Sequence, residues 1–270
     1  IKESSFVVEN YLTKPTFANF LPGIAGKKGI PLWTFYVNRG QGVSGFGIQD
    51  KNGPIMEFTP ANKAYESVGQ IGFRTFLKVD GKYYEPFSPG TENPHKMVIN
   101  KEGYEIEETI EQFGLRLHIK YFGLPSESVG ALIRKVTLEN LDNKDKNIEL
   151  IDGIAEILPA GIRNGEFKEI SNLLSSWMDV DDLDKDYAFY KLRSSTKDES
   201  EVVKVLNGNF LFSFKDGKLI KPIVDQELIF GHDNSKRKAF RLIDTSIEEI
   251  RKQEQVTVNK IPCGFIPIVQ

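Results

Sequence analysis

Cysteine is almost absent from this sequence: its 270 residues include one, Cys263, so no internal disulfide can form. The sequence also has no Asn-x-Ser/Thr site that could accept an N-linked glycan. Disulfide-rich and glycosylated extracellular domains are therefore poor comparisons for this protein. The two absences favour the cytoplasm as its compartment.

Long apolar runs and a charge of one sign are missing too. No stretch approaches the roughly 20 apolar residues that a membrane helix needs, so we expect no membrane partner. The 35 basic and 38 acidic residues are interspersed and give a net charge of −3. Because no basic run is available to neutralise a phosphate backbone, we expect no nucleic-acid partner.

Motifs for metal binding and nucleophilic catalysis are also lacking. His95, His118 and His232 are far apart and show no metal-ligand spacing, and we expect His95 and His118 at the surface. The acidic run at residues 182–186 lacks the glycine and the final carboxylate of a calcium loop, so it is interpreted as a solvated loop. No G-x-S-x-G motif occurs. We assign no catalytic residue, no metal site and no cofactor.

Alternation of apolar and polar residues is the pattern that dominates. It predicts strands over residues 71–79, 104–111, 115–122 and 132–138, separated by turn signals such as Asp80-Gly81. After a polar tip at 139–147, residues 148–151 are expected to return beside 132–138. Many short strands that follow one another directly predict an all-β, antiparallel sandwich forming a single domain over residues 1–270.

Helix signals are few, and two short helices are expected. Ser246 with Glu249 three residues later has the form of a capping box, which predicts a helix near residues 245–254. A second short helix is expected over residues 170–177, ending at Trp177.

A glycine-rich segment, Gly40-Gln41-Gly42-Val43-Ser44-Gly45, fits the pattern G-x-G-x-x-G. In a dinucleotide fold this loop must open a helix, but here it runs into the strand-like residues 46–50. We interpret it as a tight or bulged β connection. Just before it, Trp33 and Phe35 share one face of a strand, and we expect both rings in the core.

Several segments together resemble the N-terminal part of proteins related to cellobiose phosphorylase, the family 94 type of glycoside phosphorylases. The likeness is strong over about the first 80 residues, moderate to about residue 178 and thin beyond. The segments are NFLPGIAGKKGIPLW at 19–33, FYVNRGQG at 35–42, FGI at 46–48, EFTPANKAY at 57–65, GFRTF at 72–76, DGIAEILPAG at 152–161 and SSWM at 175–178.

The resemblance implies a β supersandwich similar to galactose mutarotase, followed in the family by an (α/α)6 domain that carries the catalytic acid. Those enzymes use phosphate to cleave β-glucosides with release of glucose 1-phosphate. This sequence has no segment for the helical domain, so the resemblance implies a non-catalytic N-terminal domain of a larger enzyme. The implied partners are that C-terminal catalytic domain, an oligosaccharide, phosphate and a second copy in a homodimer.

The same resemblance suggests one site element. Arg39 and Gln41, held by Gly40 and Gly42, are expected to project toward the sugar or phosphate site of the partner domain, because a guanidinium fork suits such groups. Trp33 and Trp177 are candidates for stacking on a sugar. The alternative for Arg39 is a solvated side chain or pairing within its own domain.

Three other functions remain open at this point. A free-standing mutarotase-like sugar epimerase would need a general acid and base, usually His and Glu, and only His118 or His232 could take part. A carbohydrate-binding module would show an exposed aromatic platform. A structural or dimerising domain would show neither.

Overall fold

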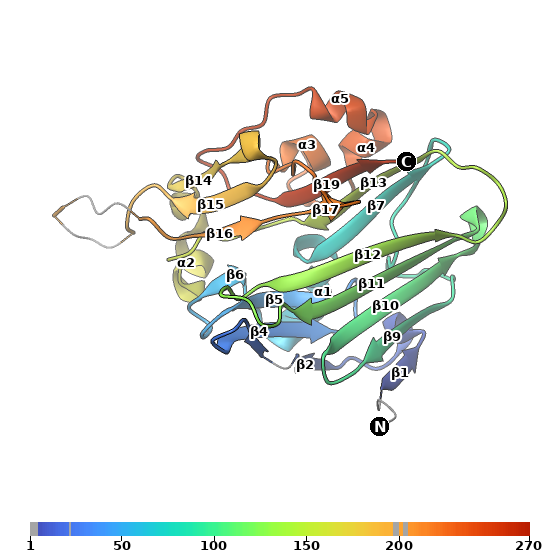
Figure 1. Ribbon diagram of the computed structural model, residues 1–270, viewed down its shortest axis with the longest axis horizontal. Helices are drawn as coiled ribbons and strands as arrows, with labels where there is room; N and C mark the ends of the chain where they lie inside the picture. The colour runs from blue at the N-terminus through green and yellow to red at the C-terminus, as the bar shows by residue number, and fades with distance from the viewer. Residues whose placement is uncertain (1–4, 22, 197–199, 202–204) are drawn as a thin grey trace.

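The computed structural model describes residues 5–21, 23–196, 200–201 and 205–270 (Figure 1). Antiparallel sheets stack face to face, and the main apolar core lies between the first of them and the inner faces of the others. The prediction of an antiparallel all-β sandwich is confirmed. No helix among these residues is both long and apolar enough to span a membrane.

The first sheet has five strands in the order β1-β9-β10-β11-β12. Its central strands alternate as expected: Leu115, Leu117 and Ile119 are fully buried, and the side chains between them are half-buried. His95 begins a strand and is buried, so the prediction that it lies at the surface is wrong. The strands are β1 (Phe6–Glu9), β9 (His95–Ile99), β10 (Gly103–Ile110), β11 (Leu115–Gly123) and β12 (Leu132–Asn140).

The second sheet has the order β19-β13-β7-β8 and contains the segment that was expected to pair with β12. Residues 148–154 do not return beside β12; the polar tip instead carries the chain across to the other layer. Because almost every residue of this strand is buried, it must lie inside a covered sheet rather than beside the exposed face of β12. The strands are β7 (Phe73–Val79), β8 (Lys82–Tyr84), β13 (Ile148–Ile154) and β19 (Gly264–Val269).

A third sheet, of order β2-β4-β5-β6 with β3 paired to β4, carries helix α1 (Ala61–Ile71) on one face. Phe35 and Val37 of β4 pack against Ala64 and Val68 of this helix. The sequence pattern missed α1 because no side chain caps its start and its first turn has no acidic residue. The strands are β2 (Ala18–Phe20), β3 (Ile24–Ala25), β4 (Ile30–Val37), β5 (Val43–Ile48) and β6 (Pro54–Met56).

The C-terminal part adds a small three-stranded sheet, a hairpin and a helical cover. Helices α3, α4 and α5 lie on the side of the second sheet that faces away from the first (Figure 1). The Ser246 hydroxyl accepts a hydrogen bond from the Glu249 N–H, which confirms the predicted cap. The elements are β14 (Met178–Asp181), β15 (Ala188–Leu192), β16 (Gly208–Leu211), β17 (Phe214–Lys215), β18 (Lys218–Leu219), α2 (Asn164–Ser175), α3 (Glu227–Phe230), α4 (Phe240–Asp244) and α5 (Ile247–Arg251).

Candidate functional site

Residues 38–42 join β4 to β5 and are called the 38–42 connection below. Asn38, at its start, is fully buried and ties it to the N-terminal segment. Its Oδ1 accepts from the Phe17 N–H at 2.9 Å, and its Nδ2 donates to the carbonyls of Tyr11 at 3.1 Å and Pro15 at 2.9 Å. One buried side chain therefore fixes the connection against three positions more than 20 residues away.

Arg39 is half-buried and held in one orientation by two carbonyl oxygens. Its Nη1 donates to Asn38 O at 2.6 Å and its Nη2 to Lys14 O at 3.1 Å. No carboxylate among the described residues forms an ion pair with it. A guanidinium has five N–H donors, so about three remain for another group. The result is a positioned cation whose charge is not neutralised by its own domain.

The two glycines permit the path of the 38–42 connection. Gly40 and Gly42 have φ of 50° and 87°, the left-handed region that side chains disfavour. A Cβ on Gly42 would lie 2.4 Å from the Tyr104 hydroxyl oxygen. That hydroxyl donates to Gln41 O at 2.9 Å, and the Tyr11 hydroxyl donates to Gly40 O. The interpretation of this segment as a tight β connection is confirmed.

Gln41 turns inward. It is 3% exposed, its Nε2 donates to Thr75 Oγ1 at 3.2 Å, and its Oε1 accepts from the Arg134 guanidinium. Of the two side chains that were expected to project from the connection, Arg39 alone reaches the surface. Gln41 instead occupies a buried polar position and joins the connection to the sheets beneath it.

Arg134 and Asp152 are the charged pair below Gln41, and the sequence pattern gave no sign of them. Their side chains are 7% and 12% exposed, and Arg134 Nη2 lies 2.7 Å from Asp152 Oδ1. Burial alone would lower the pKa of the Arg134 guanidinium, but the Asp152 carboxylate more than offsets this, and the pKa is raised. Arg134 also donates to the Tyr121 hydroxyl. The guanidinium stays charged, and its contact with Asp152 joins β12 of the first sheet to β13 of the second.

The two tryptophans are each half-buried. Trp33 Nε1 donates to Asp50 O at 2.8 Å, and its ring meets Phe58 edge-on. Trp177 packs against a separate apolar cluster that includes Leu158 and Phe167. No hydrogen bond or ring contact joins either residue to Arg39. The predicted core position holds for Phe35, and Trp33 is only partly covered.

His118 lies on the outer face of the first sheet with Glu105 beside it. Its Nε2 is 2.9 Å from Glu105 Oε2, and Lys120 lies 3.0 Å from the other carboxylate oxygen. Burial raises the pKa of Glu105, but hydrogen bonds from Lys120 and His118 outweigh this and lower it. A hollow of about 170 Å³ adjoins the pair, below the roughly 300 Å³ at which ligand pockets begin.

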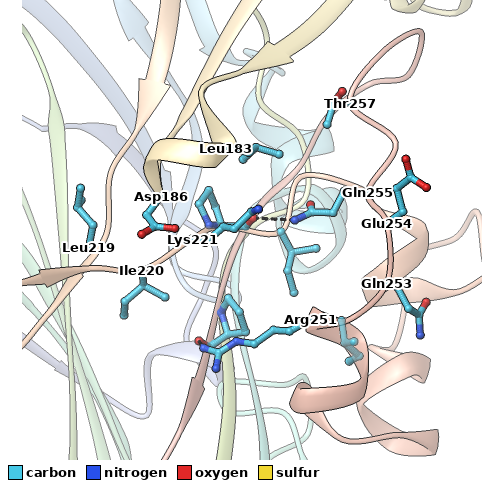
Figure 2. Close-up of a pocket in the computed structure, with 14 residues that line it drawn as sticks. Leu183, Asp186, Leu219, Ile220, Lys221, Arg251, Gln253, Glu254, Gln255 and Thr257 are labelled. Carbon is cyan, nitrogen blue, oxygen red and sulfur yellow. Dashed lines mark hydrogen bonds between the residues drawn. The ribbon is translucent and has the colours of Figure 1, made fainter.

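A larger pocket of about 580 Å³ opens between the segment after β18 and the chain that follows α5 (Figure 2). Its lining includes aliphatic residues such as Ile220, Ile223 and Ile250, and charges of both signs from Lys221, Arg251, Asp186 and Glu254. Gln255 spans it by donating to Pro222 O at 3.1 Å. Among the residues that the structure describes, no aromatic ring lines this pocket, and none of those proposed for sugar or phosphate contact reaches it.

Across the described ranges, no group of three or more His, Cys, Asp or Glu side chains could hold a metal ion. Burial raises the pKa of the Cys263 thiol well above its usual value, with Asp225 adding to the effect. Comparison with known proteins adds no family: no protein-family model and no curated sequence matches this chain.

Proposed function

We propose that this chain is a non-catalytic N-terminal domain of a glycoside phosphorylase. In that enzyme, phosphate cleaves a β-glucoside with release of glucose 1-phosphate, and the catalytic acid belongs to a separate (α/α)6 domain. The sandwich supplies a rigid wall, and Arg39 extends from it to the phosphate or the sugar hydroxyls at the edge of the active site. In this proposal the sandwich also packs against the (α/α)6 domain, and two copies of the protein form a homodimer.

The observation that carries the proposal is the state of the Arg39 side chain. A solvated arginine would be free to move, and an arginine that serves an ion pair of its own domain would lie beside a carboxylate. Arg39 is held by two carbonyl groups, lacks an acidic partner among the described residues and keeps donors available. A preorganised cation of this kind binds an anion or paired hydroxyls without first losing side-chain entropy.

The test uses the intact protein and an assay of phosphate-dependent cleavage of β-glucosides. Arg39→Ala removes charge-assisted hydrogen bonds worth about 1.5–3 kcal/mol, so kcat/KM for phosphate should fall about 10- to 100-fold. Arg39→Lys should recover only part of this, because it keeps the charge and loses the fork. Arg163→Ala is the matched control, since that arginine is exposed and its ion pair among the described residues is with Glu166, at 4.0 Å.

The two parts of the proposal fail in different ways. Unchanged kinetics in Arg39→Ala would remove Arg39 from the site and leave the domain assignment standing. An intact protein that cleaves no β-glucoside with phosphate would contradict the assignment itself.

A mutarotase-like epimerase is the second candidate, favoured by the pair His118–Glu105. The two side chains bond to each other at 2.9 Å, which is the acid and base combination that anomerisation needs. Polarimetry decides this: acceleration of glucose mutarotation that disappears in Glu105→Gln would support it. A rate equal to that of buffer alone would reject it. The small volume of the adjoining hollow makes this the weaker candidate.

A further inference from the structure

Residues 205–214 combine aromatic character with a complete lack of charge. The segment Val205-Leu206-Asn207-Gly208-Asn209-Phe210-Leu211-Phe212-Ser213-Phe214 includes three phenylalanines and no proline. Its middle forms β16, the last strand of the three-stranded sheet. A neutral, aromatic strand at a sheet edge is what folded proteins usually avoid, because it can pair with another chain.

The backbone of β16 is paired on one side only. Its residues Gly208 to Leu211 pair in register with Lys191 to Ala188 of β15, and no further backbone hydrogen bond to them occurs among the described residues. Most other edges are blocked: β1, β8, β12 and β14 carry charged residues, and β6 and β19 contain a proline. The strands β2 and β3, which have neither, span only three and two residues. The edge of β16 has neither device.

The outward side chains here are large and exposed. Phe210, Phe212 and Phe214 are 40%, 43% and 65% exposed, and Leu206 is 77% exposed. Taking roughly 200 Å² for each large side chain when free, Leu206, Phe210 and Phe212 on and beside this strand present about 320 Å² of apolar surface. An edge-to-edge pair would bring the Phe210 and Phe212 rings of both copies together on one face of the continued sheet, so each ring would cover part of the apolar surface of the others.

The ring geometry argues against a sugar platform on this surface. Phe212 is tilted by 31° to Tyr187 and by 58° to Phe210, so the rings form no common plane. The neighbouring polar groups are also occupied: the Tyr187 hydroxyl donates to Asp182, and Asn209 Nδ2 donates to Leu158 O. A sugar would find no flat face here, and these two polar groups already bond within the chain.

We propose that β16 pairs antiparallel with β16 of a second copy of this chain and continues the sheet across a two-fold axis. With Phe210 opposite its own copy, each Phe212 comes opposite Gly208 of the other chain, where it would meet the Phe189 ring that lies over this glycine. An uncharged strand meets no like charge when it faces itself. This interface uses none of the residues proposed for phosphate or sugar contact, and it does not depend on the phosphorylase assignment.

Sedimentation equilibrium of the protein tests the proposal. The wild-type chain should reach twice its 30.6 kDa mass as concentration rises. Phe210→Lys places two like charges opposite each other and should raise the dimer dissociation constant at least about 100-fold. Phe6→Lys is the matched control: Phe6 is 66% exposed on β1, at the edge of the first sheet, and the dimer should survive its substitution.

Phe210→Cys provides a second test that needs no loss of binding. Opposite residues of antiparallel strands have Cα atoms about 4.5–5.5 Å apart, which a disulfide can bridge. Mild oxidation should link two Phe210→Cys chains, whereas Phe6→Cys should stay unlinked, and the buried Cys263 should not interfere. A chain that is monomeric at every concentration, or a dimer that ignores Phe210→Lys and does not cross-link, would overturn the proposal.

Discussion

The 38–42 connection, which is largely buried, and the outer edge of β16 are both short backbone segments, and they differ in how their polar groups are satisfied. In the connection, the Asn38 and Gln41 side chains donate hydrogen bonds to Tyr11 O and Thr75 Oγ1. The hydroxyls of Tyr11 and Tyr104 in turn donate to the carbonyls of Gly40 and Gln41. In β16, one side of the backbone has no protein partner among the described residues. Hydrogen bonds therefore fix the connection that carries Arg39, whereas the outer edge of β16 is unpaired among the described residues.

This difference separates two kinds of recognition. A fixed polar segment can present one charged group to a small polar ligand with little loss of entropy. An open apolar edge gives a long row of backbone donors and acceptors, which suits another strand. Substitutions in each segment can test this difference. The 38–42 connection should depend on its buried partners, and the outer edge of β16 should not.

The largest effect should come from Arg134→Ala, which removes the cation beneath the 38–42 connection. Asp152 would then be a buried carboxylate without its partner, and Gln41 would lose a donor. We expect a loss of about 3–5 kcal/mol in the free energy of unfolding, measured by urea denaturation. Arg116→Ala is the control: its ion pairs with Glu107 and Glu139 are exposed, so it should cost less than about 1 kcal/mol. Equal losses for the two variants would contradict the buried network.

Asn38→Ala should have the next largest effect. The substitution leaves the carbonyls of Tyr11 and Pro15 and the Phe17 N–H without their partner, at a cost of about 2–3 kcal/mol. It should also release the N-terminal segment, so limited proteolysis should cut there sooner. Asn19→Ala, at an exposed position whose side chain bonds only the next residue, should change stability by less than about 0.5 kcal/mol. An Asn38→Ala protein as stable as the wild type would mean that the 38–42 connection keeps its conformation without the Asn38 side-chain hydrogen bonds.

Phe212→Thr should have the smallest effect on the folded chain. Its ring is already 43% exposed and contacts only Tyr187 and Phe210 among the aromatic residues, so the monomer should lose no more than about 1 kcal/mol. Thermal unfolding at a dilute concentration, where the chain is monomeric, measures this. A loss above about 2 kcal/mol would place Phe212 in the core and argue against a free edge.

Sequence periodicity was sufficient to predict where strands lie, but it was insufficient to predict which strands pair with each other. The alternation over residues 104–122 predicted β10 and β11 because one face of each is buried and the other faces solvent. The same reasoning misplaced β13, since a strand buried on both faces carries no sign of which sheet it enters. Helix α1 was missed because its start has no capping side chain.

For the candidate site, too, the local backbone conformation could be predicted and the contacts between distant residues could not. The glycines at positions 40 and 42 predicted a tight or bulged connection, and their positive φ angles agree with that prediction. The partners of that connection could not be foreseen: Lys14 is 25 residues from Arg39, and Arg134 is 93 residues from Gln41. Contacts of that separation depend on how the sheets stack, which no local pattern encodes. For this reason the prediction that the Gln41 side chain projects outward was wrong.

Amide hydrogen exchange, read residue by residue at low and high protein concentration, tests the account most directly. The Val37, Asn38 and Gly42 amides donate to backbone carbonyls within or beside the connection, so they should exchange slowly at both concentrations. In β16 the amides that face away from β15 should exchange fast in dilute solution and slowly in concentrated solution. Fast exchange in the 38–42 connection, or rates in β16 that do not change with concentration, would contradict the account.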